Sequence, residues 1–493
     1  SAMTSGMRRL AVALAFVGVV GALAPPPLVK PSKIQKVLSF NASSLYELEV
    51  PGFEGSLRLA DLHGSRYDMG FAYGKFLGNS SVQDMHLLLD SQVPNKFEQL
   101  VLSAFLDLQW DHFLSKNIPE TFLEELKGLD DGATEAGAPD AGKLVRRGLV
   151  ISGFPGDVGA DIKWLVINEL KSRDISEDEA SLALENLLGE NRPALLRRRC
   201  SQLAAWSDRV LGGGLLQTRN LDWAADTGIA ANKVIVVWHP ENAVAHAAAG
   251  FAGLYGSLVG MSAAGVTVGE SGDDNTRETF QGMPWVLRLR ALMETATTLA
   301  EARSFWSSTN NTMGINHVVG AASDPAAMAL ETCAGYTAYF GANDTRERDA
   351  TAQDKSGHPE RIGFPLPNAV WRTNHGYDPT WLKTAMRQNS PTSDTQVRYD
   401  LFHEALVNYE RAGVRLSLLE AANMTKLVGD KGGSDRQSFL HCVKGKGSTI
   451  LSVAMDPSNM TMAVAFEQGA GADRWAACCA NYVVLDMKTW MSR

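Results

Sequence analysis

Basic charge and metal-binding motifs are both scarce in this chain of 493 residues. Its 46 Lys and Arg residues are outnumbered by 55 Asp and Glu residues, and the formal net charge is -9. No basic stripe offsets this balance, which argues against a nucleic-acid-binding surface. HEXXH and CXXC patterns are missing as well, so we expect neither a metal site nor a cofactor.

Long apolar runs are missing too, and the one near the N-terminus is short. It extends from Leu10 to Leu23, follows Arg8 and Arg9, and is closed by Ala24 before three prolines. About twenty apolar residues are needed to span a bilayer, so a membrane anchor is disfavoured. The pattern predicts a signal peptide over residues 1–24, no stable membrane span, and a secreted or lysosomal protein.

Asn-X-Ser/Thr sequons agree with passage through a glycosylating secretory pathway. Any one of them could arise by chance, but together they predict N-glycosylation. The six candidate asparagines are Asn41, Asn79, Asn310, Asn343, Asn423 and Asn459.

Cysteine is rare, with five residues in the whole chain. In an oxidising compartment an odd number of cysteines leaves one thiol unpaired. Such a thiol either has no function or is a reagent in the protein's chemistry. We expect Cys333, Cys442, Cys478 and Cys479 to be structural, with room for two disulfides whose pairing the sequence does not determine. Cys200 is then the candidate reagent, although a cysteine taken alone is more often simply buried or disulfide-bonded.

The pattern of apolar residues changes at Cys200. Residues 25–199 are expected to be largely helical, with helices behind Pro119 and over 177–188, and to end in an exposed connector over 157–199. From residue 200 onward, runs spaced like antiparallel strands alternate with helical segments, which predicts a layered α+β sandwich. The expected strands are 201–206, 215–223, 233–238, 243–248, 257–268, 317–322, 327–331, 336–340, 448–455 and 460–466, and the expected helices are 283–306, 395–411 and 416–427.

Charged residues on the second of these strands give Cys200 a chemical context. Arg219 and Asp222 lie there within the segment Arg-Asn-Leu-Asp-Trp, and a glycine turn at 212–214 would bring them beside Cys200. Buried charges are costly unless they are paired or employed. Arg219 and Asp222 therefore form either a structural ion pair or part of an active site. In an active site, Arg219 would stabilise a thiolate and Asp222 would orient an amine.

Three motifs resemble the N-terminal-nucleophile (Ntn) cysteine hydrolases, the superfamily of acid ceramidase, choloylglycine hydrolase and penicillin acyltransferase. Cys200 followed by the segment 219–223 is similar to their nucleophile signature. Arg-Thr-Asn-His at 372–375 is similar to a motif whose asparagine serves an oxyanion hole, and 260–268 resembles the strand before the substrate loop. The resemblance covers residues 57–466, with segments similar to a pro-region at 62–70 and 124–128.

This resemblance implies a four-layer αββα sandwich with antiparallel sheets, preceded by a pro-region or α-chain at 25–199. Residues 200–493 would be a catalytic β-chain, freed by self-cleavage between Arg199 and Cys200, and the two chains would stay associated. The implied catalytic residues are Cys200 as nucleophile, Arg219 for the thiolate or substrate, Asp222 for the amine, and Asn374 for the oxyanion. Possible substrate or support residues are Asn220, Glu270, His375 and Lys446.

For His375 and Lys446 the sequence gives a more specific expectation. His375 is expected to be structural, because an N-terminal amine already serves as the base. Lys446 stands in Lys-Gly-Ser-Thr, where the family often has an arginine, so we do not expect a bidentate carboxylate clamp there.

The implied reaction is hydrolysis of a non-peptide acyl amide in a small N-acyl or lipid-like substrate, through a thioester on Cys200. An N-terminal cysteine carries its own base, since its α-amino group has a reference pKa of about 8. A serine-hydrolase elbow is not supported, because 260–264 lacks the second glycine. Alternatives are acyl transfer to an amine or lipid, a phospholipase-B-like esterase, and a non-catalytic secreted lipid-binding glycoprotein. Residues that would line an acyl pocket, or form core, are Phe251, Leu254, Tyr255, Leu258 and 283–285.

Overall fold

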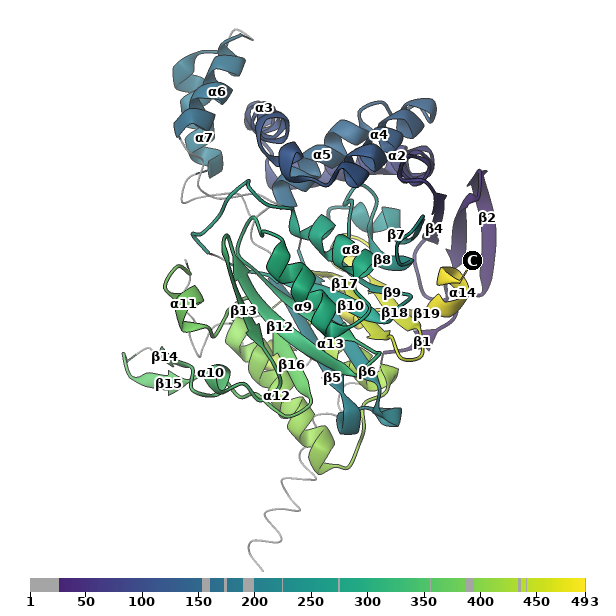
Figure 1. Cartoon of the computed structure of the whole chain (residues 1–493), viewed down its shortest axis with the longest axis vertical. Helices are drawn as coiled ribbons and strands as arrows, with labels where there is room; N and C mark the ends of the chain where they lie inside the picture. Colours follow the sequence, from purple (N-terminus) through teal and green to yellow (C-terminus); the bar gives the residue numbers. More distant parts are fainter. Residues whose placement is uncertain are drawn as a thin grey trace, which may run out of the picture.

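Two β-sheets lie face to face between two layers of helices in the computed structural model (Figure 1). The ten-stranded sheet has the order β13-β12-β11-β10-β9-β8-β7-β4-β3-β2, and the seven-stranded sheet has the order β1-β19-β18-β17-β6-β5-β16. Helices α8 (Trp285–Thr295) and α9 (Leu299–Ser308) cover the first sheet, and α12 (Asp394–Arg411) and α13 (Leu418–Val428) cover the second. The expected αββα sandwich is therefore confirmed.

The structure describes residues 26–152, 160–172, 175–188, 199–223, 225–273, 275–354, 356–385, 394–432, 436–439 and 441–492. The expected signal peptide lies outside these residues, as do Arg197 and Arg198 at the end of the expected connector. Within them, none of the helices combines the length and the apolar character that crossing a bilayer requires. The strands of the two large sheets are β1 Leu28–Val29, β2 Lys33–Phe40, β3 Ser43–Glu49, β4 Leu57–Gly64, β5 Arg199–Trp206, β6 Leu215–Asp222, β7 Lys233–Pro240, β8 His246–Phe251, β9 Val259–Ser262, β10 Val266–Gly272, β11 Ile315–Ala321, β12 Ala326–Cys333, β13 Tyr336–Phe340, β16 Ala369–Arg372, β17 Thr449–Asp456, β18 Thr461–Phe466 and β19 Tyr482–Asp486.

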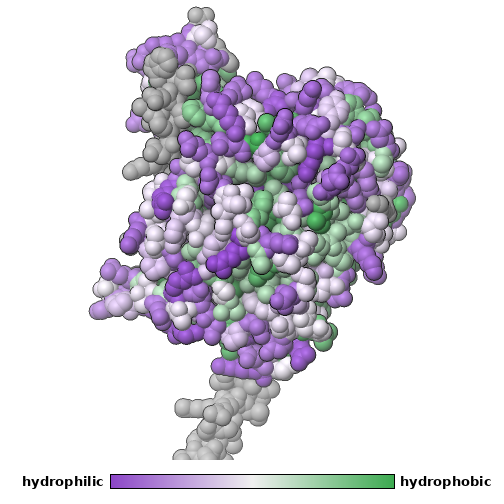
Figure 2. All heavy atoms as spheres, in the orientation of Figure 1, coloured by the Kyte–Doolittle hydropathy of each residue, from purple (hydrophilic) through white to green (hydrophobic). Residues whose placement is uncertain are grey.

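Most of the region before Cys200 is helical, as expected, and its helices lie together at one end of the sandwich (Figure 1). Helices α2 and α4 pack almost backbone to backbone, because a Cβ added to Gly70 would lie 1.8 Å from the carbonyl oxygen of Glu125. Apolar side chains are visible between these helices and the sheet layers on the face drawn in Figure 2. The helices are α2 Arg66–Gln92, α3 Lys96–His112, α4 Glu120–Glu135, α5 Ala141–Ser152, α6 Ala160–Lys171 and α7 Glu177–Leu188.

Strands β2, β3 and β4 were not foreseen, and they extend the ten-stranded sheet from its β7 side. Strand β4 pairs with β7 in parallel, residue 58 opposite 234 through 64 opposite 240. Parallel neighbours need a long crossover, which the helices between β4 and β7 supply. Antiparallel pairing therefore holds for most of the two sheets, with β4–β7 and β1–β19 as parallel exceptions.

Two expected elements are divided in the structure. The single helix expected over 283–306 is α8 and α9, because Ala296 is extended (φ -94°, ψ 140°) and the side chain of Thr298 caps α9. The strand expected over 257–268 is the hairpin β9–β10, whose turn places Gly265 at φ +79°. Both breaks depend on local backbone geometry that the apolar spacing does not reveal.

The expectation of two disulfides is wrong. Cys442 is bonded to Cys479, whereas Cys333 and Cys478 are buried thiols. Cys333 ends β12 in the ten-stranded sheet, while the segment 477–479 packs against β17 of the other sheet. Among the described residues, Cys333 and Cys478 therefore form no second bridge.

The sequon asparagines remain candidates for glycosylation. Asn41, Asn79, Asn310, Asn343 and Asn459 are exposed. Asn423 is half-buried within α13, where a glycan would have less room.

Candidate active site

Cys200 is the second residue of β5, and its side chain is fully buried. The expected hairpin is present: β5 and β6 are antiparallel neighbours, with Cys200 opposite Leu221 and Arg199 opposite Asp222. Side chains alternate between the faces of a strand, so Arg219 and Leu221 lie on the same face as Cys200. That face contacts β10 of the other sheet.

An ion pair between Arg219 of β6 and Glu270 of β10 faces the Cys200 sulfur. Nη2 of Arg219 lies 3.8 Å from Sγ, and Oε1 of Glu270, on β10, lies 3.9 Å from it. Arg219 pairs with the Glu270 carboxylate and also donates from Nε to the Glu270 carbonyl at 3.1 Å. Among the described residues, Oε2 of Glu270 has no hydrogen-bond partner. The site thus holds a buried acceptor next to the thiol.

The thiol itself is neutral in the uncleaved chain. Burial raises the pKa of Cys200 to about 12, with a further rise from the Glu270 carboxylate that the Arg219 guanidinium opposes. Arg219 is therefore not sufficient to hold a thiolate here. Attack by this sulfur needs a base that takes its proton.

Asn374 and Arg398 hold the peptide groups of Cys200. Oδ1 of Asn374 accepts from the backbone N–H of Cys200 at 2.9 Å and from Nη2 of Arg398 at 2.8 Å. Arg398 also donates to the Cys200 carbonyl and, at 2.8 Å, to Oγ of Ser201. The Asn374 side-chain N–H groups, the expected oxyanion donors, include one that donates to the carbonyl of Gly272.

Asp222 lies on the opposite face of β6 from Arg219, next to Arg199 on β5. Its Oδ1 accepts from Oγ1 of Thr449, while Oδ2 has no hydrogen-bond partner among the described residues. Burial raises the pKa of Asp222 to about 6, against the nearby Arg398 guanidinium. The carboxylate is therefore beside the bond that would be cleaved, on the side away from the sulfur.

The other three support residues lie outside this cluster. Asn220 anchors α13, since it donates to the Thr425 carbonyl at 2.7 Å. The His375 ring accepts or donates at both nitrogens, to Thr395 and to the Tyr377 hydroxyl, and burial lowers its pKa to about 3. Lys446 is exposed. These contacts agree with a structural His375 and give Lys446 no place beside Cys200.

Sequence reasoning missed Arg398, which is fully enclosed within α12. A weak signal was available, since an arginine between Val397 and Tyr399 on a helix that buries Tyr399 must have a partner. The partner, however, is 198 residues away in the sequence. Helix spacing alone does not identify it.

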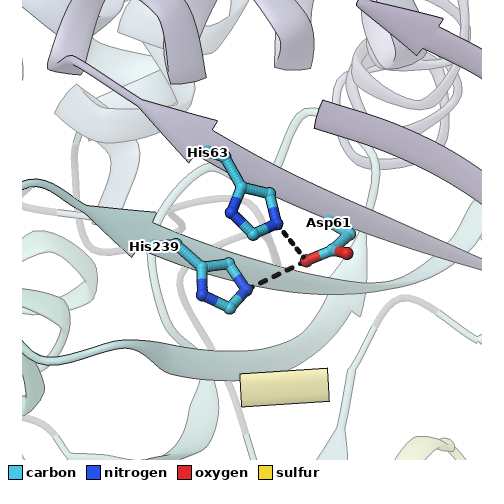
Figure 3. A group of neighbouring side chains, drawn as sticks. All are labelled: Asp61, His63 and His239. Carbon is cyan, nitrogen blue, oxygen red and sulfur yellow. Dashed lines mark hydrogen bonds and ion pairs between the residues drawn. The ribbon is translucent and has the colours of Figure 1, made fainter. Parts of the chain in front are cut away.

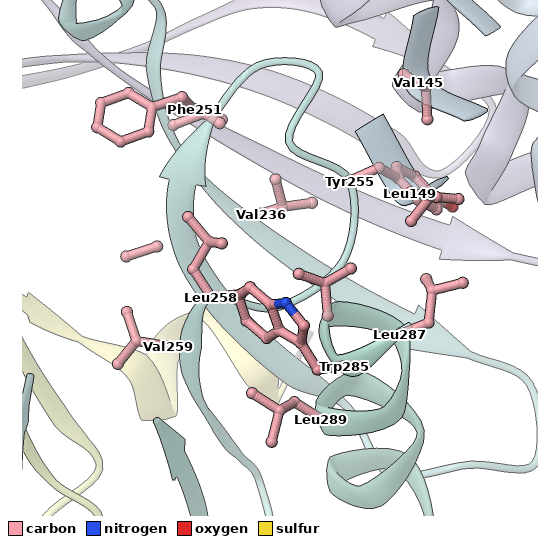
Figure 4. Close-up of a cluster of buried hydrophobic side chains, with 14 of the residues drawn as sticks. Val145, Leu149, Val236, Phe251, Tyr255, Leu258, Val259, Trp285, Leu287 and Leu289 are labelled. Atoms are coloured by element: carbon pink, nitrogen blue, oxygen red, sulfur yellow. The ribbon is translucent and has the colours of Figure 1, made fainter. Parts of the chain in front are cut away.

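A cavity opens next to Leu221, the cross-strand neighbour of Cys200. Of the residues for which the sequence left an acyl pocket or the core as alternatives, Leu254, Tyr255, Leu258 and Trp285 line this cavity, and Figure 4 shows Leu258 next to the Trp285 ring. Phe251 instead packs against Phe466 in the core. The rest of the lining includes residues of α2 and α5, namely Met85, Leu88, Leu89, Gly148, Ile151 and Ser152. The region before Cys200 therefore contributes a wall of the cavity.

A family model described as Acyl-coenzyme A:6-aminopenicillanic acid acyl-transferase matches residues 210–470, more than half of the chain. Among curated proteins, Protein dcd1B of Dictyostelium discoideum is 24% identical over 280 residues, which are 55% of this chain and 49% of that protein. The chain thus spans about half the length of this relative.

Two solved structures are also similar. The N-acylethanolamine-hydrolyzing acid amidase (NAAA) ortholog of Caenorhabditis elegans is 14% identical with a TM-score of 0.33, covering 52% of this chain and 93% of that chain. A mutant conjugated bile acid hydrolase from Clostridium perfringens is 12% identical with a TM-score of 0.35, covering 59% and 93%. Scores this low do not establish a common fold, and the αββα assignment rests on the sheets and helices themselves.

Proposed function

Because the chain belongs to the acyl-coenzyme A:6-aminopenicillanic acid acyl-transferase family, and with it to the Ntn superfamily, we propose that it is an N-terminal cysteine amidohydrolase activated by cleavage between Arg199 and Cys200. One observation carries the proposal. The Cys200 sulfur lies against Arg219 and Glu270, while the backbone N–H and carbonyl of the same residue are held by Asn374 and Arg398.

Cleavage begins with the sulfur of Cys200. Sγ attacks the Arg199 carbonyl carbon and Glu270 accepts the thiol proton. This proton is then transferred to the Cys200 nitrogen as the C–N bond breaks, so that the acyl group moves from nitrogen to sulfur. Water then hydrolyses this thioester, which releases the Arg199 carboxylate and leaves Cys200 with a free thiol and a free α-amine. Oδ1 of Asn374 already accepts from that nitrogen, and Asp222 lies beside Arg199.

Turnover uses the new amine as the base. With a reference pKa of about 8, the α-amine takes the thiol proton, and the thiolate attacks the acyl carbonyl of the substrate. An N–H of Asn374 released from Gly272 stabilises the oxyanion, a contact whose loss costs about 3 to 4 kcal/mol in other enzymes. The amine product leaves with the proton, and water hydrolyses the acyl thioester.

The cavity favours an apolar acyl chain as the part of the substrate that is recognised. Its lining residues are mostly aliphatic or aromatic, and it begins beside Leu221, the neighbour of the nucleophile. An N-acyl or lipid-like amide fits this description. Passage through the secretory pathway, with a signal peptide at 1–24 and glycans on the exposed sequons, to a secreted or lysosomal location is part of the same proposal.

The two chains are proposed to stay associated after cleavage. Arg66 of α2 makes a two-point ion pair with Glu294 of α8, at 3.0 and 2.6 Å. Glu125 of α4 makes another with Arg290 of α8, at 2.6 and 2.9 Å, and also accepts from the Tyr255 hydroxyl. Truncating one partner of such a buried pair is strongly destabilising, because it leaves a charge uncompensated.

Acyl transfer is the second candidate, favoured by the description of the family. It shares the Cys200 thioester and differs only in whether an amine or lipid, rather than water, attacks it. An esterase that uses the same thioester is the third. Product analysis with and without an added amine separates transfer from hydrolysis.

The test is a screen of the cleaved protein against N-acyl amides of increasing chain length. We expect hydrolysis that favours long chains, lost in Cys200→Ala and retained in Cys333→Ala, which removes another buried thiol. Met85→Trp should shift the preference to shorter chains, because Met85 of α2 lines the cavity. No turnover by the cleaved wild-type protein would favour the lipid-binding glycoprotein instead.

A further inference from the structure

Two histidines and an aspartate converge at the junction of β4 and β7, apart from the Cys200 cluster. Nε2 of His63 lies 3.0 Å from Oδ1 of Asp61, and Nε2 of His239 lies 2.9 Å from the same oxygen. Figure 3 shows both imidazole rings directed at this carboxylate. In sheet order, β9 and β8 separate this pair of strands from β10, which carries Glu270.

The convergence follows from strand register. The parallel pairing of β4 with β7 places His63 directly opposite His239. Asp61 precedes His63 by two residues, so its side chain lies on the same face of the sheet. The two imidazole rings stack with their centres 3.9 Å apart and their planes 7° from parallel. The backbone register therefore brings Asp61, His63 and His239 together.

Two imidazole nitrogens and one carboxylate oxygen are ligands that first-row divalent metals accept. The three ligand atoms lie within 4.8 Å of one another. Around a tetrahedral zinc ion, with bonds of about 2.0 to 2.1 Å, neighbouring ligand atoms are about 3.3 Å apart. The two distances from the carboxylate oxygen to the ring nitrogens, 3.0 and 2.9 Å, are a few tenths of an ångström shorter than that spacing.

Access to the cluster is also suitable for an ion. The side chains of His63 and His239 are 17% and 10% exposed, whereas that of Asp61 is 4% exposed. An ion can therefore enter from the histidine side, and water can complete the coordination there. Hard cations such as Mg²⁺ prefer oxygen ligands and do not match this set.

We propose that Asp61, His63 and His239 form a binding site for a divalent transition-metal ion, with Zn²⁺ as the best match. Local motifs do not reveal it, because His239 is 178 residues from Asp61 in the sequence. If the chain is cleaved before Cys200, as proposed above, the metal connects the two products, since β4 precedes the cleavage point and β7 follows it. Metal binding itself does not depend on that cleavage.

The test measures Zn²⁺ binding to the full-length chain carrying Cys200→Ala, which removes the reactive thiol and keeps the protein as a single chain. Competition with a chromophoric chelator and elemental analysis after dialysis should give one bound Zn²⁺. His239→Ala should weaken binding at least a hundredfold. His358→Ala is the matched control, because His358 is exposed and 3.8 Å from Asp354, and it belongs to no metal-binding group of three among the described residues.

Asp61→Asn provides a second variant that keeps the stacked rings and the shape of the side chain. Zn²⁺ should raise the unfolding temperature of the Cys200→Ala protein and of its His358→Ala variant, but not of its Asp61→Asn or His239→Ala variants. Co²⁺ in the same site should give the visible absorption of a four-coordinate ion. The proposal is overturned if Zn²⁺ does not bind at 100-fold excess over protein, or if His239→Ala and Asp61→Asn both bind it as well as the control.

Discussion

Chain cleavage should depend weakly on pH in the wild-type protein and steeply in Glu270→Gln. With the pKa of Cys200 at about 12, a free thiolate makes up about 10⁻⁷ of the thiol at pH 5 and about 10⁻⁴ at pH 8. Attack by free thiolate would therefore accelerate about a thousandfold over this range. If Oε1 of Glu270, 3.9 Å from Sγ, takes the proton during the attack, the neutral thiol reacts and this dependence is removed.

The pH dependence of the cleavage rate, and not the absolute rate, shows whether Glu270 takes the thiol proton. Glu270→Gln removes a base, but it also removes a carboxylate that raises the pKa of Cys200, so the two changes oppose each other in the rate. Without the base, the rate should still rise about tenfold for each pH unit. The assay follows the mass of freshly translated chain at pH 5 to 8 in the presence of protease inhibitors.

Glu467→Gln is the matched control, since Glu467 is also buried and pairs with Arg474 at 2.8 Å. It should keep the flat wild-type profile. A wild-type rate that itself rises about a thousandfold from pH 5 to pH 8 would refute the role of Glu270. A flat profile in Glu270→Gln would refute it equally.

Three further outcomes are expected. Asn374→Ala, once cleaved, should hydrolyse substrate at least about a hundredfold more slowly, because an oxyanion donor is lost; wild-type turnover would exclude that role. Intact-mass analysis should find Cys200→Ala as one chain and the triple alanine variant of 197–199 still split, and the reverse result would mean that an external protease cuts. Asp84→Asn should raise the unfolding temperature more at pH 8 than at pH 5, because burial raises the pKa of Asp84 to about 8 from 3.8, so its ionisation destabilises the folded chain as pH rises through this window. Asp90→Asn, exposed on the same helix, should give no such gain, and an equal gain would contradict the reasoning.

Elements whose limits are set by their own residues could be predicted from the sequence. Helix α7 occupies 177–188 and strand β13 occupies 336–340, as expected, because apolar spacing and turn residues act within a few positions. The break between α8 and α9 was missed, since Ala296 and Leu299 continue the apolar stripe of a single helix. Only the side-chain cap of Thr298 marks the new start.

The residues of the candidate site also differ in whether the sequence could place them. Cys200, Arg219 and Asp222 lie on one hairpin, so a correct turn was enough to place them together. The spacing of three residues places Arg219 and Asp222 on opposite faces of a strand. Which of the two faces the sulfur depends on the pairing register, which spacing does not give. Arg398 lies on α12, and its contact with Cys200 exists only once the helix packs on the sheet.

The parallel pairing of β4 with β7 has a consequence for how the protein can be produced. All the residues of β7 except His239 are buried, and the strand is rich in valine and isoleucine. A chain expressed alone from Cys200 would lack β4 and would present β7 as an open, apolar sheet edge, the kind of edge that other strands join and that leads to aggregation. We therefore expect a soluble product to require the segment before Cys200. If the chain is cleaved as proposed, both parts are best obtained from a precursor that has already folded.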